Sequence, residues 1–209
     1  MVSMGLVLKD KEKIVVKVSE RFLCDGFYKI TMSEIASELH ISKKTIYKYF
    51  PTKEALVESA IDFFTGAVRA DVEKIVNSKE NSVIKFCKLI ERIWNIFLKV
   101  SDKWLNELHT FMPETWKKVD DFRAKMIFKN ITKLIEQGKK EKLINDYPTP
   151  IIMNVFLSSV RATVNPEFVI NNNFSLLQAI DSTFEILLNG ILTEKGKKTY
   201  KSFKKRIKQ

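Results

Sequence analysis

The chain has 209 residues, of which 45% are hydrophobic and 11% aromatic, so it can bury a sizeable core and is not disordered. Its apolar runs are shorter than the roughly 20 residues that cross a bilayer, and its first eight residues are too short and uncharged for a signal peptide. These features predict a cytoplasmic, globular protein with no membrane partner.

The net charge of +11 is unevenly distributed. Residues 1–53 carry ten basic and six acidic groups, residues 54–194 carry eighteen and nineteen, and residues 195–209 carry eight and none. A basic start on a neutral body fits a nucleic-acid-binding end attached to a larger part with another role. An AT-rich genome can produce the same lysine content, and the tail at 195–209 can equally be a solubilising or frayed terminus.

The first predicted helix covers about residues 10–24. Ile14, Val18, Phe22 and Leu23 are expected on one face of it. Gly26 supplies the left-handed residue that ends many helices, and Phe27 can fold back on Phe22 as in a Schellman motif. We expect this helix to support the two helices that follow it.

Residues 31–53, TMSEIASELHISKKTIYKYFPTK, predict a helix-turn-helix. Thr31 and Glu34 form a capping box for a helix that starts at the next residue. His40 lies in the turn, where histidine tolerates a left-handed conformation. Ser42 then caps a second helix, residues 43–49. A capped helical hairpin whose lysines are simply solvated is the alternative.

The second of these helices has a basic outer face without an acidic residue. Ile46 and Phe50 point inward, Pro51 ends the helix, and Thr52 can cap the next one. Lysines meet phosphates or guanine edges in a major groove, and hydroxyl groups reach phosphate oxygens or bases. The residues expected near the groove are Lys43, Lys44, Thr45, Tyr47 and Lys48.

The stretch IASELHISKKTIYKYFPTKEAL, residues 35–56, resembles the TetR family of transcriptional regulators. Two positions depart from the family pattern: His40 replaces a usual glycine, and Lys44 replaces a usual small residue. The resemblance implies an all-α protein with an N-terminal three-helix DNA-binding head, residues 1–52, joined to a larger helical body for ligand binding and dimerisation, residues 53–209. It also implies phosphate contacts by Thr31, Ser33, Ser42, Tyr47, Tyr49 and Lys53.

Helical periodicity continues through the predicted body. It predicts a long helix from Lys53 to about residue 77 and further helices at about 82–100, 101–111 and 113–138. The long helix starts in the head and can act as a lever between head and body. A loop is expected at 139–150, because Asp146, Pro148 and Pro150 interrupt the pattern.

Two apolar helices, 151–163 and 174–192, are expected near the end of the chain. Such helices can bury one face on their own body and the other on a second copy, giving a four-helix bundle in a homodimer, as in the family. Leu187 is expected in that interface. A helix pair buried within one chain is the alternative.

The middle of the predicted body is rich in aromatic residues. An ordinary helical core explains such a stripe, whereas the resemblance implies a pocket for a small hydrophobic ligand. The expected pocket residues are Phe64, Trp94, Phe97, Trp104, Glu107, His109, Phe111, Trp116, Phe122 and Met126.

Catalytic, metal and cofactor signals are absent from the sequence. The two histidines and two cysteines have no metal spacing, no phosphate loop or nucleophile motif is present, and we expect neither an enzyme nor a cofactor. Cys24 and Cys87 are expected to be core thiols, with redox sensing as the alternative.

The favoured function is a dimeric repressor that leaves a palindromic DNA operator when it binds a small hydrophobic ligand. A helical carrier of small molecules or lipids with a degenerate DNA-binding head is a second possibility. An architectural DNA binder is a third.

Overall fold

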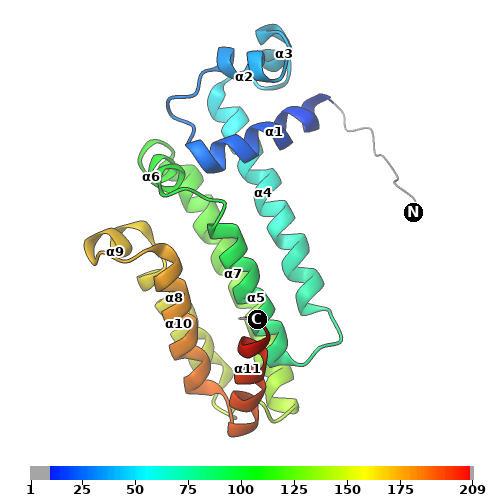
Figure 1. Ribbon diagram of the computed structural model, residues 1–209, viewed down its shortest axis with the longest axis vertical. Helices are drawn as coiled ribbons and strands as arrows, with labels where there is room; N and C mark the ends of the chain where they lie inside the picture. The colour runs from blue at the N-terminus through cyan, green and yellow to red at the C-terminus, as the bar shows by residue number, and fades with distance from the viewer. Residues whose placement is uncertain (1–9, 208–209) are drawn as a thin grey trace. The chain divides into compact units, whose positions relative to one another are not determined.

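The structure is a computed structural model that describes residues 10–207. That part of the chain is helical, with one isolated antiparallel bridge between Ile144 and Leu192. The first four helices are α1 (Asp10–Asp25), α2 (Met32–Glu38), α3 (Lys43–Tyr49) and α4 (Lys53–Val76). The remaining helices are α5 (Ser82–Phe97), α6 (Asp102–Phe111), α7 (Pro113–Lys140), α8 (Thr149–Thr163), α9 (Pro166–Asn171), α10 (Leu176–Ile191) and α11 (Glu194–Ile207) (Figure 1). The all-α prediction is therefore confirmed.

The chain divides into two compact units. Unit 1 is Met1–Val68 with Lys99–Trp116, and unit 2 is Arg69–Leu98 with Lys117–Gln209. Helix α6 and the start of α7 thus belong with the helix-turn-helix, although they follow it by some fifty residues in the sequence. The expected boundary at 52/53 does not coincide with this division, because the first two-thirds of α4 also lie in unit 1.

Unit 1 is built on the apolar face of α1. Ile14, Val18 and Phe22 are buried at the expected four-residue spacing. Gly26 ends the helix with φ +76°, its N–H donates to the Phe22 carbonyl at 3.0 Å, and Phe27 turns back so that its ring centroid lies 6.3 Å from that of Phe22. The predicted helix end is confirmed. Helix α6 packs against α1 (Figure 1).

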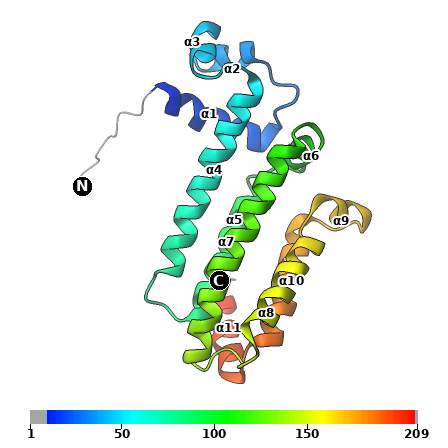
Figure 2. The ribbon, with the colours of Figure 1, turned by 180° about the vertical axis from the view of Figure 1, so that it is seen from behind.

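Unit 2 has a core in which α5, α8 and α10 meet. The Phe156 ring lies 6.2 Å from the Phe86 ring and 6.1 Å from the Phe184 ring, measured between centroids, so one aromatic side chain of α8 joins α5 to α10. Helices α8 and α10 run side by side (Figure 2). Helix α9, which the sequence did not predict, connects them between Asn165 and the Asn171–Asn173 region.

The basic tail is a folded part of unit 2 as far as residue 207. Helix α11 packs on α5 and buries Tyr200, and Lys204 pairs with the Glu185 carboxylate. Gly196 permits a close approach, because a Cβ atom there would lie 2.1 Å from the Leu143 carbonyl oxygen. Through residue 207 the frayed-terminus alternative is therefore wrong.

Candidate nucleic-acid interface

The capping box predicted at the start of α2 is present. The Thr31 hydroxyl accepts from the Glu34 N–H at 3.2 Å, and the Glu34 carboxylate accepts from the Thr31 N–H at 2.6 Å. These hydrogen bonds to Thr31 hold the pKa of the Glu34 carboxyl below its ordinary value. Thr31 and Ser33 are exposed at this end of α2.

The turn between α2 and α3 contains His40 in the left-handed conformation, with φ 52°. This residue replaces the glycine usual at the position, and histidine is one of the residue types that adopt the left-handed region more often than most. The Ile41 N–H donates to the Ala36 carbonyl at 3.0 Å and closes the turn. The turn sets the angle at which α3 leaves α2.

Helix α3 has the bounds that the sequence predicted. Ser42 caps it by accepting from the Thr45 N–H at 3.0 Å, and Ile46 and Phe50 are almost completely buried beneath it. This anchoring leaves the charged and hydroxyl-bearing side chains on the outside. Ser42, Lys43, Lys44, Tyr47 and Lys48 are exposed, and Thr45 and Tyr49 are half-buried.

Lys53 lies at the first position of α4. The helix is capped by Thr52, whose hydroxyl accepts from the Ala55 N–H at 3.1 Å. The Lys53 ammonium donates to the Tyr28 carbonyl at 2.7 Å. Burial lowers the pKa of this ammonium, and the carboxylates of Glu54, Glu107 and Glu34 oppose the shift. An ammonium has three N–H donors, so a bond to Tyr28 leaves others for a phosphate.

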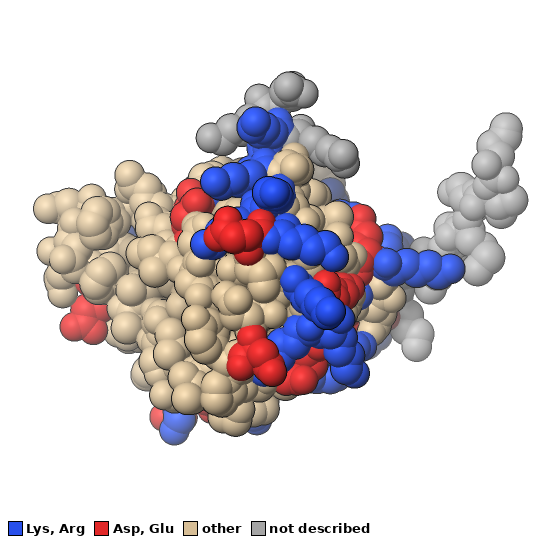
Figure 3. Space-filling model, turned by 90° about the horizontal axis from the view of Figure 1, so that it is seen from below, with Lys and Arg blue, Asp and Glu red and all other residues tan. Residues whose placement is uncertain are grey.

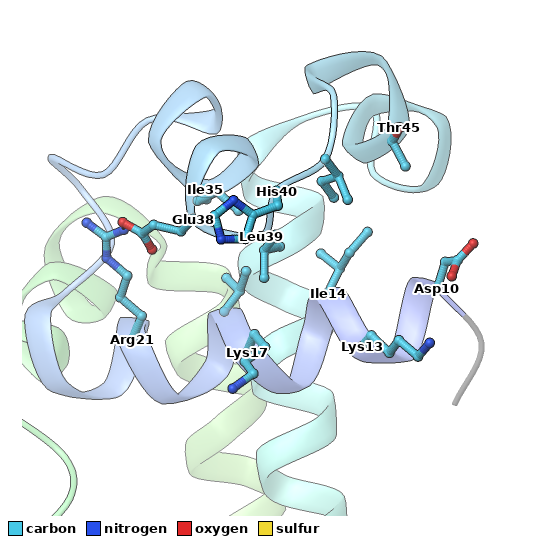
Figure 4. Close-up of a pocket in the computed structure, with 12 residues that line it drawn as sticks. Asp10, Lys13, Ile14, Lys17, Arg21, Ile35, Glu38, Leu39, His40 and Thr45 are labelled. Carbon is cyan, nitrogen blue, oxygen red and sulfur yellow. The ribbon is translucent and has the colours of Figure 1, made fainter. Parts of the chain in front are cut away.

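A groove of about 620 Å³ lies between α1 and the α2–α3 turn (Figure 4). Ile14 projects from α1 on the side that carries Leu39 and His40, and Thr45 of α3 borders the groove. Two exposed lysines of α1, Lys13 and Lys17, lie on its rim.

Lys13 and Lys17 are candidate phosphate contacts that the sequence reasoning did not single out. Their spacing of four residues, on the helix expected to support the reading pair, was the available signal. Lys11 belongs to the same group, because its ammonium lies 5.5 Å from the centre of the Phe50 ring at the end of α3.

The residues expected to form a ligand pocket are divided between the two units. Phe64, Trp104, Glu107, His109, Phe111 and Trp116 belong to unit 1, and Trp94, Phe97, Phe122 and Met126 belong to unit 2. Several have local roles: the Trp116 ring meets the His109 ring edge-on, the Phe122 ring lies under the Arg69 guanidinium, and the Glu107 carboxylate binds backbone N–H groups of the α1–α2 loop.

The cysteines differ from each other. Cys87 is buried on α5 and burial raises the pKa of its thiol to about 12, as expected for an unreactive core thiol. Cys24 is exposed at the end of α1, so the prediction of a core thiol was wrong there. Of its neighbours at the end of α1, Leu23 is half-buried and Asp25 is exposed.

The face of the molecule seen in Figure 3 is not uniformly positive. On the face shown in Figure 3, Lys and Arg side chains lie among Asp and Glu side chains. Among residues 10–207, no group of three or more His, Cys, Asp or Glu side chains is arranged to hold a metal ion. No helix of that range is long and apolar enough to span a membrane.

Comparisons with known proteins agree with this interface. Residues 19–60 match the family model of bacterial regulatory proteins of the tetR family. Over 190 residues the chain is 21% identical to the uncharacterized HTH-type transcriptional regulator YvaF of Bacillus subtilis (strain 168), covering 88% of this chain and 96% of that protein.

Two solved structures are similar in fold. A TetR transcription regulator from Haloarcula marismortui ATCC 43049 has a TM-score of 0.68 at 15% identity, covering 88% of this chain and 98% of that one. A transcriptional regulator from Saccharomonospora viridis in complex with choline has a TM-score of 0.65 at 15% identity and the same coverage. With the helix-turn-helix and its basic helix α3, the family-model match and the similarity to YvaF identify a DNA-binding transcriptional regulator whose DNA-binding end, residues 19–60, is of the tetR family type.

Proposed function

We propose that the protein is a repressor that binds a palindromic operator as a two-fold dimer and leaves it when a small hydrophobic ligand binds. The observation that carries the DNA-binding part is the exposed face of α3. Lys43, Lys44, Tyr47 and Lys48 are exposed on it, while Ile46 is 0% exposed and anchors the helix. A short rigid helix with this face can enter a major groove.

The contacts divide into two classes by their place on the head. Lys44 and Thr45, near the start of α3, are proposed to read bases, with Lys43 beside them. Thr31, Ser33, Ser42, Tyr47, Tyr49 and Lys53 are proposed to hold phosphates, with Lys48 at the groove edge. Phosphate contacts fix the register of α3 on the duplex without selecting a sequence.

An exposed apolar surface on α8 and α10 supports dimerisation. Ile151, Val155 and Ile186 are 60%, 48% and 71% exposed, which is unusual for such side chains on neighbouring helices. Ser158, Ala162 and Gly190 are also exposed on these helices, and their small side chains allow a partner helix to approach closely. We propose that two copies of α8 and α10 form a four-helix bundle and place two copies of α3 on the two half-sites.

A small organic ligand is proposed to act on the helices between Leu56 and Gly138. The relative that binds choline supports a small-molecule ligand for a regulator of this fold. Helix α4 runs without interruption from Lys53 to Val76, so a change along it can be transmitted to the DNA-binding end. If a ligand lowers operator affinity tenfold, the operator must lower ligand affinity tenfold, a coupling of about 1.4 kcal/mol.

The test begins with selection of duplexes from a random-sequence DNA library by the wild-type protein. We expect one palindrome to be enriched and its binding to weaken steeply with salt. A variant with Tyr47→Ala, Lys48→Ala and Lys53→Ala should lose binding. A control with Lys74→Ala and Lys79→Ala, two exposed lysines of unit 2, should keep it.

Other outcomes of this selection contradict the proposal. Binding without sequence preference indicates an architectural DNA binder, and absence of DNA binding indicates a carrier.

The ligand is tested separately. Hydrophobic metabolites are screened by the fluorescence of Trp94, Trp104 and Trp116, with operator release followed in parallel. Ligands that bind while operator affinity stays constant at saturation would refute release by ligand.

A further inference from the structure

The loop between α1 and α2 is held by a carboxylate from α6. Glu107 Oε2 accepts from the Phe27 N–H at 2.5 Å and from the Tyr28 N–H at 2.8 Å. The Glu107 side chain is buried, and its other oxygen lies 3.9 Å from the Lys103 ammonium. A buried carboxylate that accepts two backbone N–H groups makes strong, charge-assisted hydrogen bonds, and its removal leaves both donors unsatisfied.

The Glu107 carboxylate lies directly beside Gly26. A Cβ atom on Gly26 would lie 2.5 Å from Glu107 Oε2, so the carboxylate occupies the space that the glycine leaves open. The left-handed φ of Gly26 turns the next two N–H groups toward that space. The loop and α6 are therefore fitted to each other, although they are about eighty residues apart.

Tyr28 joins this anchor to the DNA-binding residues. Its ring stacks on the Phe111 ring of α6, with centroids 3.9 Å apart and planes at 11°. Its carbonyl accepts from the Lys53 ammonium at 2.7 Å. The chain of contacts thus runs from α6 through the loop to Lys53, entirely within unit 1.

We propose that Glu107 is a positioning residue for operator binding, which fixes the α1–α2 loop so that the Tyr28 carbonyl holds the Lys53 ammonium in place for a DNA phosphate. The inference rests on the proposed function, in particular on the phosphate contact of Lys53. A lysine side chain loses much rotamer freedom when it binds a phosphate. An acceptor that orients the ammonium before DNA arrives removes part of that loss from the binding step.

The same contacts give α6 an influence on DNA affinity. A displacement of Glu107 or Phe111 would release Tyr28 and, with it, the acceptor for Lys53. The residues of α6 that the sequence assigned to a ligand pocket would then act on the DNA-binding end through the backbone of the loop.

The test is a double-mutant cycle of Glu107→Ala and Lys53→Ala, measured on the duplex that the wild-type protein selects. Lys53→Ala should bind about tenfold more weakly, the loss of one charge-assisted hydrogen bond, and should lower the slope of log affinity against log salt by about one unit. Glu107→Ala should bind about threefold more weakly with a nearly unchanged slope, because the Lys53 ammonium keeps its phosphate contact but is no longer oriented before DNA arrives. The double variant should bind no more weakly than Lys53→Ala alone, because without the ammonium the loop has nothing to orient.

Controls separate positioning from a general effect on folding. Glu114→Ala, which removes an exposed carboxylate from the same unit, should leave affinity and salt slope unchanged. Glu107→Gln keeps an oxygen acceptor and should recover part of the affinity. If Glu107→Ala does not fold, Glu107→Gln in combination with Lys53→Ala carries the same cycle with a smaller single loss.

Two results would overturn the proposal and leave the function intact. One is an additive loss in the double variant, and the other is an affinity of Glu107→Ala equal to that of the wild-type protein. Either would mean that Glu107 only stabilises unit 1. If the wild-type protein selects no duplex, or Lys53→Ala binds normally, the proposed function or its phosphate contact fails instead.

Discussion

The hydroxyl oxygens of Thr163 and Thr183 lie 2.8 Å apart and join α8 to α10 within one chain. Thr183 is buried, and Phe156 and Phe184 pack in the same layer between the two helices. The inner faces of α8 and α10 are thus used inside unit 2. The opposite faces of the two helices carry the exposed side chains of Ile151, Val155 and Ile186. These are the faces proposed to contact a second copy of the chain.

The proposed dimer can be tested at Ile186. This side chain is 71% exposed, so Ile186→Asp should leave unit 2 folded and convert the dimer to a monomer at micromolar concentration in sedimentation. Operator binding should fall with it, since the second half-site is lost. Ile170→Asp, which changes a 59% exposed isoleucine on α9, is the control. If the Ile186→Asp variant remains dimeric, the proposed interface is wrong.

Leu187 is not the residue for this test, contrary to the expectation from the sequence. It is 8% exposed and buried within its own unit, so a charge there would disrupt the core of unit 2 rather than the interface alone. A one-residue step on a helix rotates the side chain by about 100°, which is why neighbours at 186 and 187 face opposite environments.

Lys44 and Lys53 should have different effects on DNA binding. Lys44→Ala should alter which base pairs are preferred, because the side chain is exposed at the start of α3. Lys53→Ala should weaken binding to all duplexes alike and lower the salt slope by about one unit. Selection from a random library, repeated with each variant, separates the two. If Lys44→Ala lowers the affinity for every duplex equally, Lys44 does not contribute to base recognition.

The Glu185–Lys204 pair predicts a dependence of stability on pH. The hydrogen bond from Lys204 lowers the pKa of the Glu185 carboxyl, so its contribution is present above the ordinary value of 4.5 and is lost as pH falls through the folded value. The pair is over a third exposed, so the contribution should be below about 1 kcal/mol.

Glu185→Gln should therefore flatten the fall in the free energy of unfolding below pH 5, measured by urea denaturation. Glu167→Gln, an exposed carboxylate of α9, should leave the pH profile unchanged. At the alkaline end, burial alone would lower the pKa of the Lys204 ammonium, but its hydrogen bonds to Glu185 and Tyr200 raise it. The pair should thus persist until the pH exceeds the ordinary lysine value of 10.5.

The two thiols should differ in reactivity. An aromatic disulfide reagent at pH 8 should modify Cys24 quickly in the folded protein, because that thiol is exposed. Cys87 should react only on unfolding, because it is buried and its thiol pKa is raised to about 12. Cys24→Ser should abolish the fast phase. A fast phase that survives this substitution would mean that Cys87 is accessible in the folded protein.

The helices of the DNA-binding end could be predicted from residue type and spacing. Thr31, Ser42 and Thr52 each accept a hydrogen bond from an N–H three residues later, and Gly26 and His40 adopt the left-handed conformations expected of them. These features depend on residues within one helical turn, so they can be read from spacing and residue type alone. The exposed basic face of α3 follows from the same periodicity.

Contacts between residues far apart in the chain could not be predicted in this way and became visible in the folded structure. Glu107 of α6 holds a loop about eighty residues earlier, and α11 docks on α5 through Tyr200. Nothing in the local pattern around Glu107 distinguishes a buried carboxylate from a solvated one, because its partners are backbone N–H groups that every residue but proline carries. The folded chain brings the N–H groups of Phe27 and Tyr28 to that carboxylate, and this long-range match places a residue of α6 beside the α1–α2 loop.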